Sequence, residues 1–233
     1  MKKAEIYFLI FIFALTGFTA CPALAHNPRI VSGEGTLNIQ KPEISQAFYG
    51  QLKGVPHVFE INSDIDFSLY VNILVPKLPD INKDISVLIF KELKWQAGQP
   101  KLIGTLKGSN YEWKEFYEPF TGDSYWQGPE FKQEAEPAKY TIYVMSSCSL
   151  PYVQGLSLYQ LDCKNTGKYS LAVGEDEKFP PSEILNTILL LPQIKKDFFN
   201  KSPWTAYFNR VGLFVLGPVF VLLGTIIVLF WAF

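Results

Sequence analysis

The sequence is poor in charge, in histidine and in the motifs that mark most enzymes. Charged residues make up 18% of the 233 residues, and the net charge is −1. A nucleic-acid-binding protein normally carries a basic patch, which this balance argues against. The two histidines, His26 and His57, belong to no HExxH motif, and the chain has no GxSxG, P-loop or GxGxxG motif. These absences predict a non-enzymatic protein with no metal and no cofactor.

The chain begins with an apolar segment that is typical of a secretory signal peptide. Two lysines precede an apolar run of ten residues, and Ala23-Leu24-Ala25 forms an A-x-A cleavage site. We therefore predict a signal peptide over residues 1–25 and a mature chain that starts at His26. Two alternatives stay open: a loose lipobox in which Cys21 is lipidated, and an uncleaved membrane anchor.

A second apolar segment covers residues 211–233, which contain no charged side chain. At about 1.5 Å per residue this run is long enough to cross a hydrocarbon core of about 30 Å. Trp204 and Trp231, near its ends, are typical of interfacial aromatics. We predict a transmembrane helix within residues 204–233 and a single-pass protein with an extracytoplasmic N-terminal domain, at the cell surface or in a periplasm. The alternative is a GPI signal near Ser202, in which the apolar tail is removed.

Cys148 and Cys163 form a pair that lies between two strand-like runs. In an exported domain, two cysteines that flank one loop predict a disulfide. Two free thiols are the alternative. A zinc site would need further ligands, and no histidine lies nearby in the sequence.

Period-2 alternation of apolar and polar residues dominates the middle of the chain. It is clearest in residues 67–75, where Phe67, Leu69 and Val71 share one side. Similar short runs, separated by Gly, Pro, Asn and Asp, occupy residues 36–40, 57–61, 85–89, 102–106, 140–146, 153–158 and 168–173. This pattern predicts an all-β, jelly-roll-like antiparallel β-sandwich over residues 26–178.

The pattern becomes helical after the last of these runs. Ser182 is a candidate N-cap, Glu183 lies in the expected first turn, and Pro192 is expected to kink or stop the helix. An apolar stripe at helical spacing lies between them: Ile184, Leu185, Ile188 and Leu189. We predict a juxtamembrane amphipathic helix and linker over residues 179–203. Its apolar face either packs on the sandwich or lies in the membrane interface, and both alternatives stay open.

Two of the strand-like runs resemble a known family. Residues 67–71 (FSLYV) and 167–174 (GKYSLAVG) are similar to strands of the pre-peptidase C-terminal type domain. Domains of this family are small secreted β-sandwiches, often appended to bacterial exoenzymes. The layout also resembles uncharacterised prokaryotic proteins with a signal peptide, one such sandwich and one C-terminal span. The resemblance implies a binding or accessory role and carries no catalytic motif.

The most unusual stretch covers residues 111–131, with eight aromatic and five acidic side chains among 21 residues. Exposed rings stack on sugars or anchor a protein partner, and carboxylates bond hydroxyl groups. We therefore select four candidate binding residues: Trp113, Tyr117, Tyr125 and Trp126. A structural interpretation competes, because strand alternation would place half of the rings in the core.

Together these features favour a membrane-anchored extracytoplasmic binding or accessory module that is not an enzyme. Its ligand would be a protein partner or a glycan, with the C-terminal helix as the contact to the membrane. One alternative is a structural subunit of a membrane complex, recruited through the span and residues 184–199. The other is a hydrolase whose carboxylates in residues 111–131 converge in a cleft.

Overall fold

The computed structural model describes residues 26–33, 35–92, 100–146 and 164–212, together with residues 217, 222–224 and 226. The predicted signal peptide, Cys148, Cys163 and the predicted strand at 153–158 lie outside these residues, as does most of the run 211–233. Within the described part, no helix has both the length and the apolar character needed to cross a membrane. The membrane span and the disulfide therefore stay predictions.

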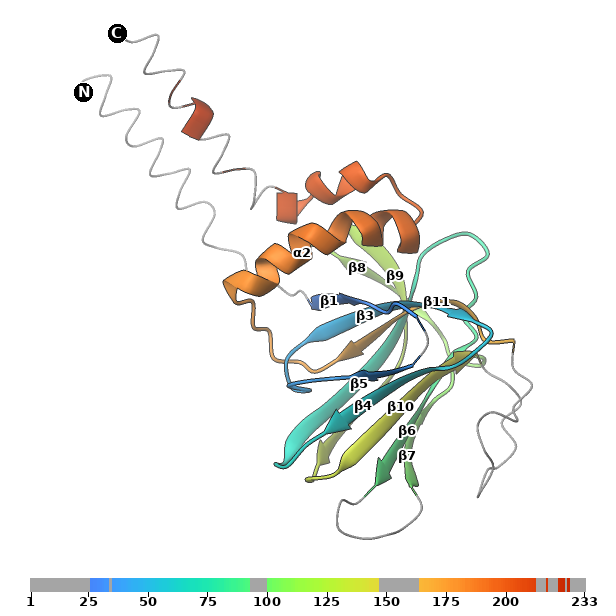
Figure 1. Cartoon of the computed structure of the whole chain (residues 1–233). Coiled ribbons are helices and arrows are strands. Elements are labelled where there is room, and N and C mark those ends of the chain that lie inside the picture. The colour runs from blue at the N-terminus through green and yellow to red at the C-terminus, as the bar shows by residue number, and fades with distance from the viewer. Residues whose placement is uncertain are drawn as a thin grey trace.

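Two β-sheets make up the body of the protein (Figure 1). The six-stranded sheet has the order β1 (Asn27–Ile30), β3 (Gln46–Lys53), β11 (Thr166–Val173), β5 (Phe67–Pro76), β9 (Asp123–Ala135) and β8 (Lys114–Glu118). The five-stranded sheet has the order β2 (Thr36–Asn38), β4 (His57–Asn62), β10 (Lys139–Ser146), β6 (Ile85–Glu92) and β7 (Lys101–Leu106).

The all-β prediction is confirmed, but the sheets are mixed rather than purely antiparallel. β1 pairs in parallel with β3, and β2 pairs in parallel with β4. Both parallel strands are short and lie at the edge of their sheet, before the long antiparallel strands begin in the sequence. The remaining described strand pairs are antiparallel.

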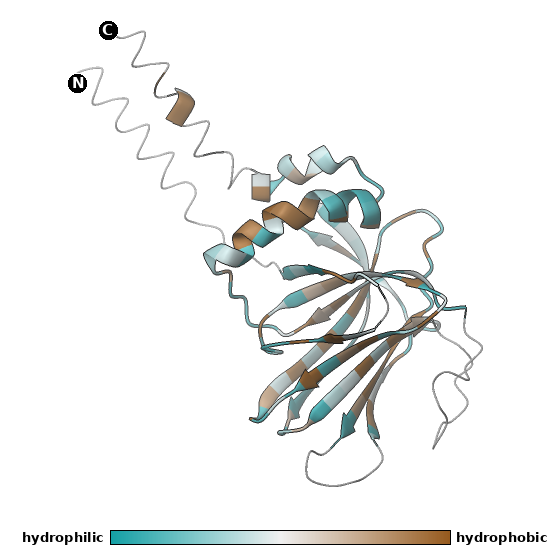
Figure 2. Ribbon diagram, viewed as in Figure 1, coloured by the Kyte–Doolittle hydropathy of each residue, from teal (hydrophilic) through white to brown (hydrophobic). Residues whose placement is uncertain are grey.

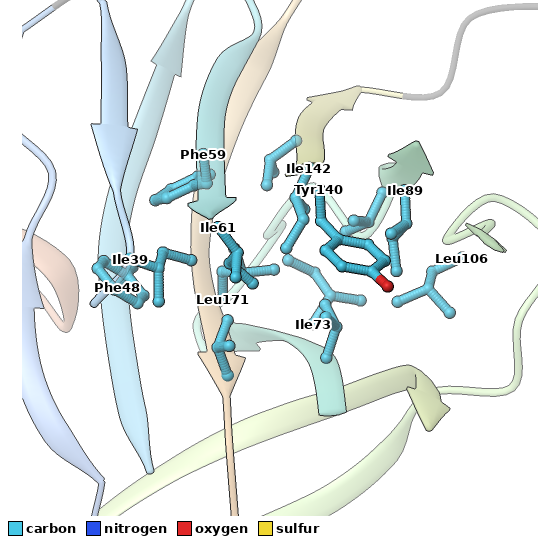
Figure 3. Packing of buried hydrophobic residues seen from close by; sticks show 14 of the residues in the cluster. Ile39, Phe48, Phe59, Ile61, Ile73, Ile89, Leu106, Tyr140, Ile142 and Leu171 are labelled. Atoms are coloured by element: carbon cyan, nitrogen blue, oxygen red, sulfur yellow. The ribbon is translucent and has the colours of Figure 1, made fainter. Parts of the chain in front are cut away.

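The main core lies between the two sheets. Alternate side chains of the long strands point into it, as the period of two along a strand requires. Ile73, Ile89 and Ile142 are fully buried there, and the Phe48 and Phe59 rings meet edge to face at 5.3 Å (Figure 3). The predicted alternation of apolar residues therefore corresponds to the inner faces of the sandwich.

A helical segment covers the outer face of the six-stranded sheet (Figure 1). It consists of α2 (Pro181–Gln193), a π-helical turn η2 (Ile194–Phe198) and a 3₁₀ turn η3 (Pro203–Tyr207). One expectation for this segment was wrong: the N-cap of α2 is Pro180 rather than Ser182, with no side-chain hydrogen bond. The α-helix ends at Gln193, one residue after Pro192, and the π-helical turn follows directly.

The underside of this segment forms a second apolar cluster with the sheet. Ile194, Phe198 and Phe199 pack against Leu74 and Tyr125, which point outward from β5 and β9. The Phe198 ring lies 5.0 Å from that of Tyr49 on β3 and 6.4 Å from that of Tyr125. The central strands of this sheet are thus buried on both faces, on one by the facing sheet and on the other by the helical segment.

An ion pair holds the start of α2 to the edge strand β1. The Arg29 guanidinium donates to both carboxylate oxygens of Glu183, at 2.8 and 2.9 Å. This bidentate contact lowers the pKa of the Glu183 carboxyl below its usual value of 4.5, although partial burial acts in the opposite direction. The contact therefore stabilises the folded protein above that value and is lost as the pH falls through the lowered pKa.

We predict that the Glu183→Gln substitution destabilises the protein by about 1 kcal/mol near neutral pH, because the charged pair is lost. The difference from wild type should vanish at an acidic pH below the lowered pKa of Glu183, where the carboxyl is protonated in the folded and the unfolded state. Urea unfolding at the two pH values measures this. The matched control is Glu175→Gln, whose ion pair with Lys132 is exposed and should contribute little. An equal destabilisation by Glu183→Gln at both pH values would contradict the prediction.

Candidate binding surface

The edge strand β8 is the most exposed part of the six-stranded sheet. Among the described strands it pairs only with β9, so one of its sides has no neighbouring strand. The first four residues of β8 are exposed, including Phe116 and Tyr117, and the Tyr117 side chain is 57% exposed. An edge strand presents unpaired backbone N–H and C=O groups to any chain that approaches it. β8 therefore combines exposed aromatic rings with free backbone donors and acceptors.

Three of the four predicted site residues belong to one side of this edge. Tyr117 lies opposite Ser124 and Glu115 opposite Trp126 in the β8–β9 pairing, so Tyr117 and Trp126 are diagonal neighbours on the same face. Trp113 packs on that face as well, since a Cβ atom at Gly128 would lie 2.7 Å from its ring. Three of the four candidate aromatic residues therefore belong to one surface.

Tyr125 lies apart from the other three. It is 4% exposed and points to the opposite face of β9, under the helical segment, where its ring meets that of Phe199 edge to face at 5.1 Å. Tyr125 and Trp126 are adjacent along an extended strand, and alternation sends them to opposite faces. Tyr125 is therefore a packing residue and is unavailable to a ligand at the sheet edge.

Positive charges surround Trp126. The Lys83 ammonium lies 3.5 Å from the centroid of the Trp126 ring, within the range of a cation–π contact. The Lys77 ammonium lies 5.6 Å from the same centroid and forms an ion pair with Glu115 at 2.5 Å. One face of the Trp126 ring is thus already covered by Lys83. Tyr117 is consequently the most accessible ring of this surface.

Trp113 is held by its own polar atom. Its indole N–H donates to the Gly108 carbonyl at 2.9 Å, and its ring packs partly buried against the main core. Gly128 leaves the space that the ring occupies, and Asn72 of β5 donates to the carbonyls of Gly128 and Pro129 at 3.3 Å each, where the β5–β9 register shifts. Trp113 therefore supports the surface from below rather than projecting from it.

A buried ionic cluster, which the sequence did not predict, lies beneath the helical segment. The Lys195 ammonium donates to the Asp123 carboxylate and to the Thr121 carbonyl, each at 2.6 Å, and Lys201 donates to the second Asp123 oxygen at 2.8 Å. Lys195 is 1% exposed and Asp123 is fully buried. Burial lowers the pKa of the Lys195 ammonium, while the Asp123 carboxylate acts in the opposite direction. The cluster joins the β8–β9 turn to η2 and to the chain that follows it.

Glu118, the other buried carboxylate near this turn, is engaged by the backbone. One of its oxygens accepts from the Phe120 N–H at 2.8 Å, and the other accepts from the Thr121 N–H at 2.7 Å and from the Thr121 hydroxyl. The Glu118 carboxylate therefore accepts hydrogen bonds from turn amides, and the Asp123 carboxylate binds two lysines. A hydrolase would need its two carboxylates facing an open cleft, and these two lie under the helical segment.

A small cavity lies between the sheet and the helical segment. Its volume is about 30 Å³, and its lining includes His26, Tyr49, Glu118, Tyr125 and Thr187. The Tyr49 and Tyr125 hydroxyls are hydrogen-bonded to each other at 2.9 Å, and burial raises the pKa of both. Small-molecule sites are usually at least 300 Å³. This cavity has room for a water molecule but not for a sugar or a peptide.

His57, the one histidine of a predicted strand, belongs to the core. Its Nδ1 atom is hydrogen-bonded to the Tyr169 hydroxyl at 2.6 Å, and both residues are buried. Burial lowers the pKa of the His57 imidazole and raises that of the Tyr169 phenol well above its usual value. The pair thus satisfies two buried polar groups between the sheets, which is a structural role.

No protein-family model and no curated protein sequence matches the chain. Solved structures similar to it include the pre-peptidase C-terminal domain of a Bacillus anthracis collagenase, at 15% identity over 61% of this chain and 98% of that chain, with a TM-score of 0.32. This is a domain of the family that two strand motifs resemble in the sequence.

Two further similar structures are a periplasmic inhibitor of g-type lysozyme from Aeromonas hydrophila and a mitogen from Yersinia pseudotuberculosis. The inhibitor is 16% identical over 63% of this chain and 97% of its own, with a TM-score of 0.34. The mitogen is 10% identical over 60% of this chain and 92% of its own, with a TM-score of 0.33. At these identities the likeness concerns the β fold alone.

Proposed function

We propose that this protein is a non-enzymatic binding module, held at a membrane with its sandwich on the extracytoplasmic side, whose edge strand β8 pairs with an extended segment of a protein partner. The observation that carries the proposal is the combination on β8 of an open strand edge with the exposed Tyr117 ring. Strand addition gives affinity through main-chain hydrogen bonds and specificity through alternate side chains.

Charges of both signs lie around the edge. Glu112, Glu115 and Glu130 are exposed in or beside the β8–β9 ribbon. Lys114 is exposed on β8, and Lys77 and Lys83 lie over the Trp126 ring. Glu115 is paired with Lys77, and the Glu130 carboxylate accepts from the Tyr70 hydroxyl at 3.1 Å. Complementary charge at an interface raises the association rate and fixes register more than it raises affinity.

A glycan is the second candidate, because Tyr117 presents a ring that a sugar could stack on, beside carboxylates that could bond hydroxyl groups. We favour the protein partner since a sugar would leave the free backbone groups of β8 unused. The same surface serves both candidates, and the same substitution tests both.

We predict that Tyr117→Ala weakens partner binding at least tenfold, because a central exposed aromatic anchor is removed. The experiment selects extended peptides from a displayed random-peptide library against the full-length protein in phosphatidylcholine nanodiscs, and screens a glycan array in parallel. Affinities are then measured by interferometry for wild type and variant.

The matched control is Leu102→Ala, which removes an exposed apolar side chain from β7, an edge strand of the other sheet. The affinity of the Leu102→Ala protein for the selected peptides should equal that of wild type. The strand-addition proposal would be overturned if the selected peptides bound the Tyr117→Ala protein with the same affinity as wild type. Glycan binding that Tyr117→Ala abolishes would replace the partner with a sugar.

A further inference from the structure

The outer side of the helical segment carries large apolar side chains that no described residue covers. Leu185 and Leu189 on α2 are 59% and 67% exposed, and Trp204 and Phe208, in and just after η3, are 72% and 84% exposed. We call these four residues the outer apolar surface. Leu185 and Leu189 are four residues apart and therefore lie on one face of the helix.

Leu185 and Leu189 lie on the side of α2 opposite its buried residues. Leu191 is buried with Ala206 and Val211, and Thr187 is buried with its hydroxyl bonded to the Glu183 carbonyl. Hydrophobic residues occupy much of the middle of α2, as Figure 2 shows. The buried residues of α2 therefore leave Leu185 and Leu189 of the stripe that the sequence shows exposed.

The position of the surface along the chain indicates what covers it. α2 and η3 contact each other, and η3 and residues 210–212 lie on the side of α2 that faces away from the sheets (Figure 1). The uncharged run 211–233 starts three residues after Phe208. The outer apolar surface thus lies where the chain passes from the folded domain into its most apolar segment.

We propose that the outer apolar surface lies in the interface of a lipid bilayer, so that the helical segment forms a layer between the six-stranded sheet and the membrane. This rests on the membrane attachment proposed above. Exposed leucine and tryptophan side chains are typical of segments that lie at the boundary between headgroups and acyl chains. Exposed Lys196 on the same segment is available to phosphate groups.

Contacts on the buried side of the helical segment would fix the orientation of the sandwich relative to the membrane. Lys195 and Lys201 bind Asp123 at the start of β9, and Asn209 donates to the Thr121 carbonyl of the preceding β8–β9 turn at 2.8 Å. The sandwich is therefore fixed to the segment that meets the lipid. β8, which leads into this turn, would be presented at a defined position close to the membrane surface.

The test places a fluorescent reporter on the surface of the full chain. Leu189→Trp is compared with Ile65→Trp, a matched exposed aliphatic residue in the sandwich, 69% exposed. Both proteins are placed in nanodiscs of phosphatidylcholine brominated near the headgroup end of its acyl chains. We expect bromine to quench the added emission at position 189 and to leave the added emission at position 65 unquenched.

Equal quenching, or equal lack of quenching, at the two positions would overturn the inference. The Trp231→Phe variant separates this outcome from failure of the membrane attachment itself: if it removes quenched emission, the tail is in the bilayer whatever position 189 reports. If position 189 is shielded from bromine while sedimentation shows a dimer, a second copy of the chain covers the surface instead, and the lipid proposal is wrong.

Discussion

Asp123→Ala is expected to destabilise the protein by about 3–5 kcal/mol, because it leaves the Lys195 ammonium buried without its counter-charge. Lys195 would keep the Thr121 carbonyl as its hydrogen-bond partner, which does not neutralise the charge. Urea unfolding of the full-length protein in detergent micelles, followed by tryptophan fluorescence, measures the change. The loss should appear as a lower midpoint with an unchanged slope.

Lys201→Ala is the matched control for this cluster. Lys201 donates to the same Asp123 carboxylate, but its side chain is 41% exposed, so water can replace the contact. We expect a loss of less than about 1 kcal/mol. An Asp123→Ala protein as stable as the Lys201→Ala protein would show that the helical segment is not held through the buried pair.

Phe198→Ala is expected to cost about 3–5 kcal/mol, the usual range for removing a buried phenylalanine ring. The Phe198 ring contacts the rings of Tyr49, Tyr125 and Phe199 in the cluster between the helical segment and the sheet. Its removal would leave a cavity beside the Tyr49–Tyr125 hydrogen bond. The same urea experiment measures the loss, and hydrogen exchange should show weaker protection of the amides in α2.

Phe208→Ala is the control, because Phe208 belongs to the outer apolar surface and does not belong to this cluster. In detergent we expect a change within about 0.5 kcal/mol. A Phe198→Ala protein with unchanged stability would mean that the helical segment does not pack on the sheet in solution.

The strands that the sequence predicted well are those with clear alternation. β5, β6, β10 and β11 fall where apolar and polar residues alternate. β3 was missed, because Phe48 and Leu52 face the main core while Ala47 and Tyr49 face the helical segment. A strand that is buried on both faces loses the period of two that reveals a half-exposed strand.

The aromatic stretch shows where local sequence stops being informative. Alternation correctly implied that part of its rings would be structural, and Tyr125 and Trp126 do point to opposite faces of β9. Which face was covered depended on a helical segment some 70 residues further along the chain, as the 72-residue separation of Asp123 and Lys195 illustrates. No local pattern in residues 111–131 indicated that Tyr125 would be the buried member.

Lys195 is the clearest case of a residue whose role the sequence concealed. Beside an apolar stripe and ahead of an apolar tail, a lysine pair is most simply interpreted as exposed, and Lys196 is exposed. The π-helical turn η2 instead contains both Lys195 and Phe198 as buried residues. π-helical turns are rare and often occur at functional sites, and the sequence offers no direct signal for one.

The most direct test of the account is a double-mutant cycle between Asp123 and Lys195, because the buried pair fixes the helical segment, and with it the proposed membrane layer, to the sandwich. The free energies of unfolding of Asp123→Ala, Lys195→Ala and the double variant are measured under the same conditions in detergent micelles. The account predicts a coupling energy of about 2–3 kcal/mol, with the double variant much less destabilised than the sum of the single variants. Additivity within about 0.5 kcal/mol would contradict it, because independent sites behave in that way.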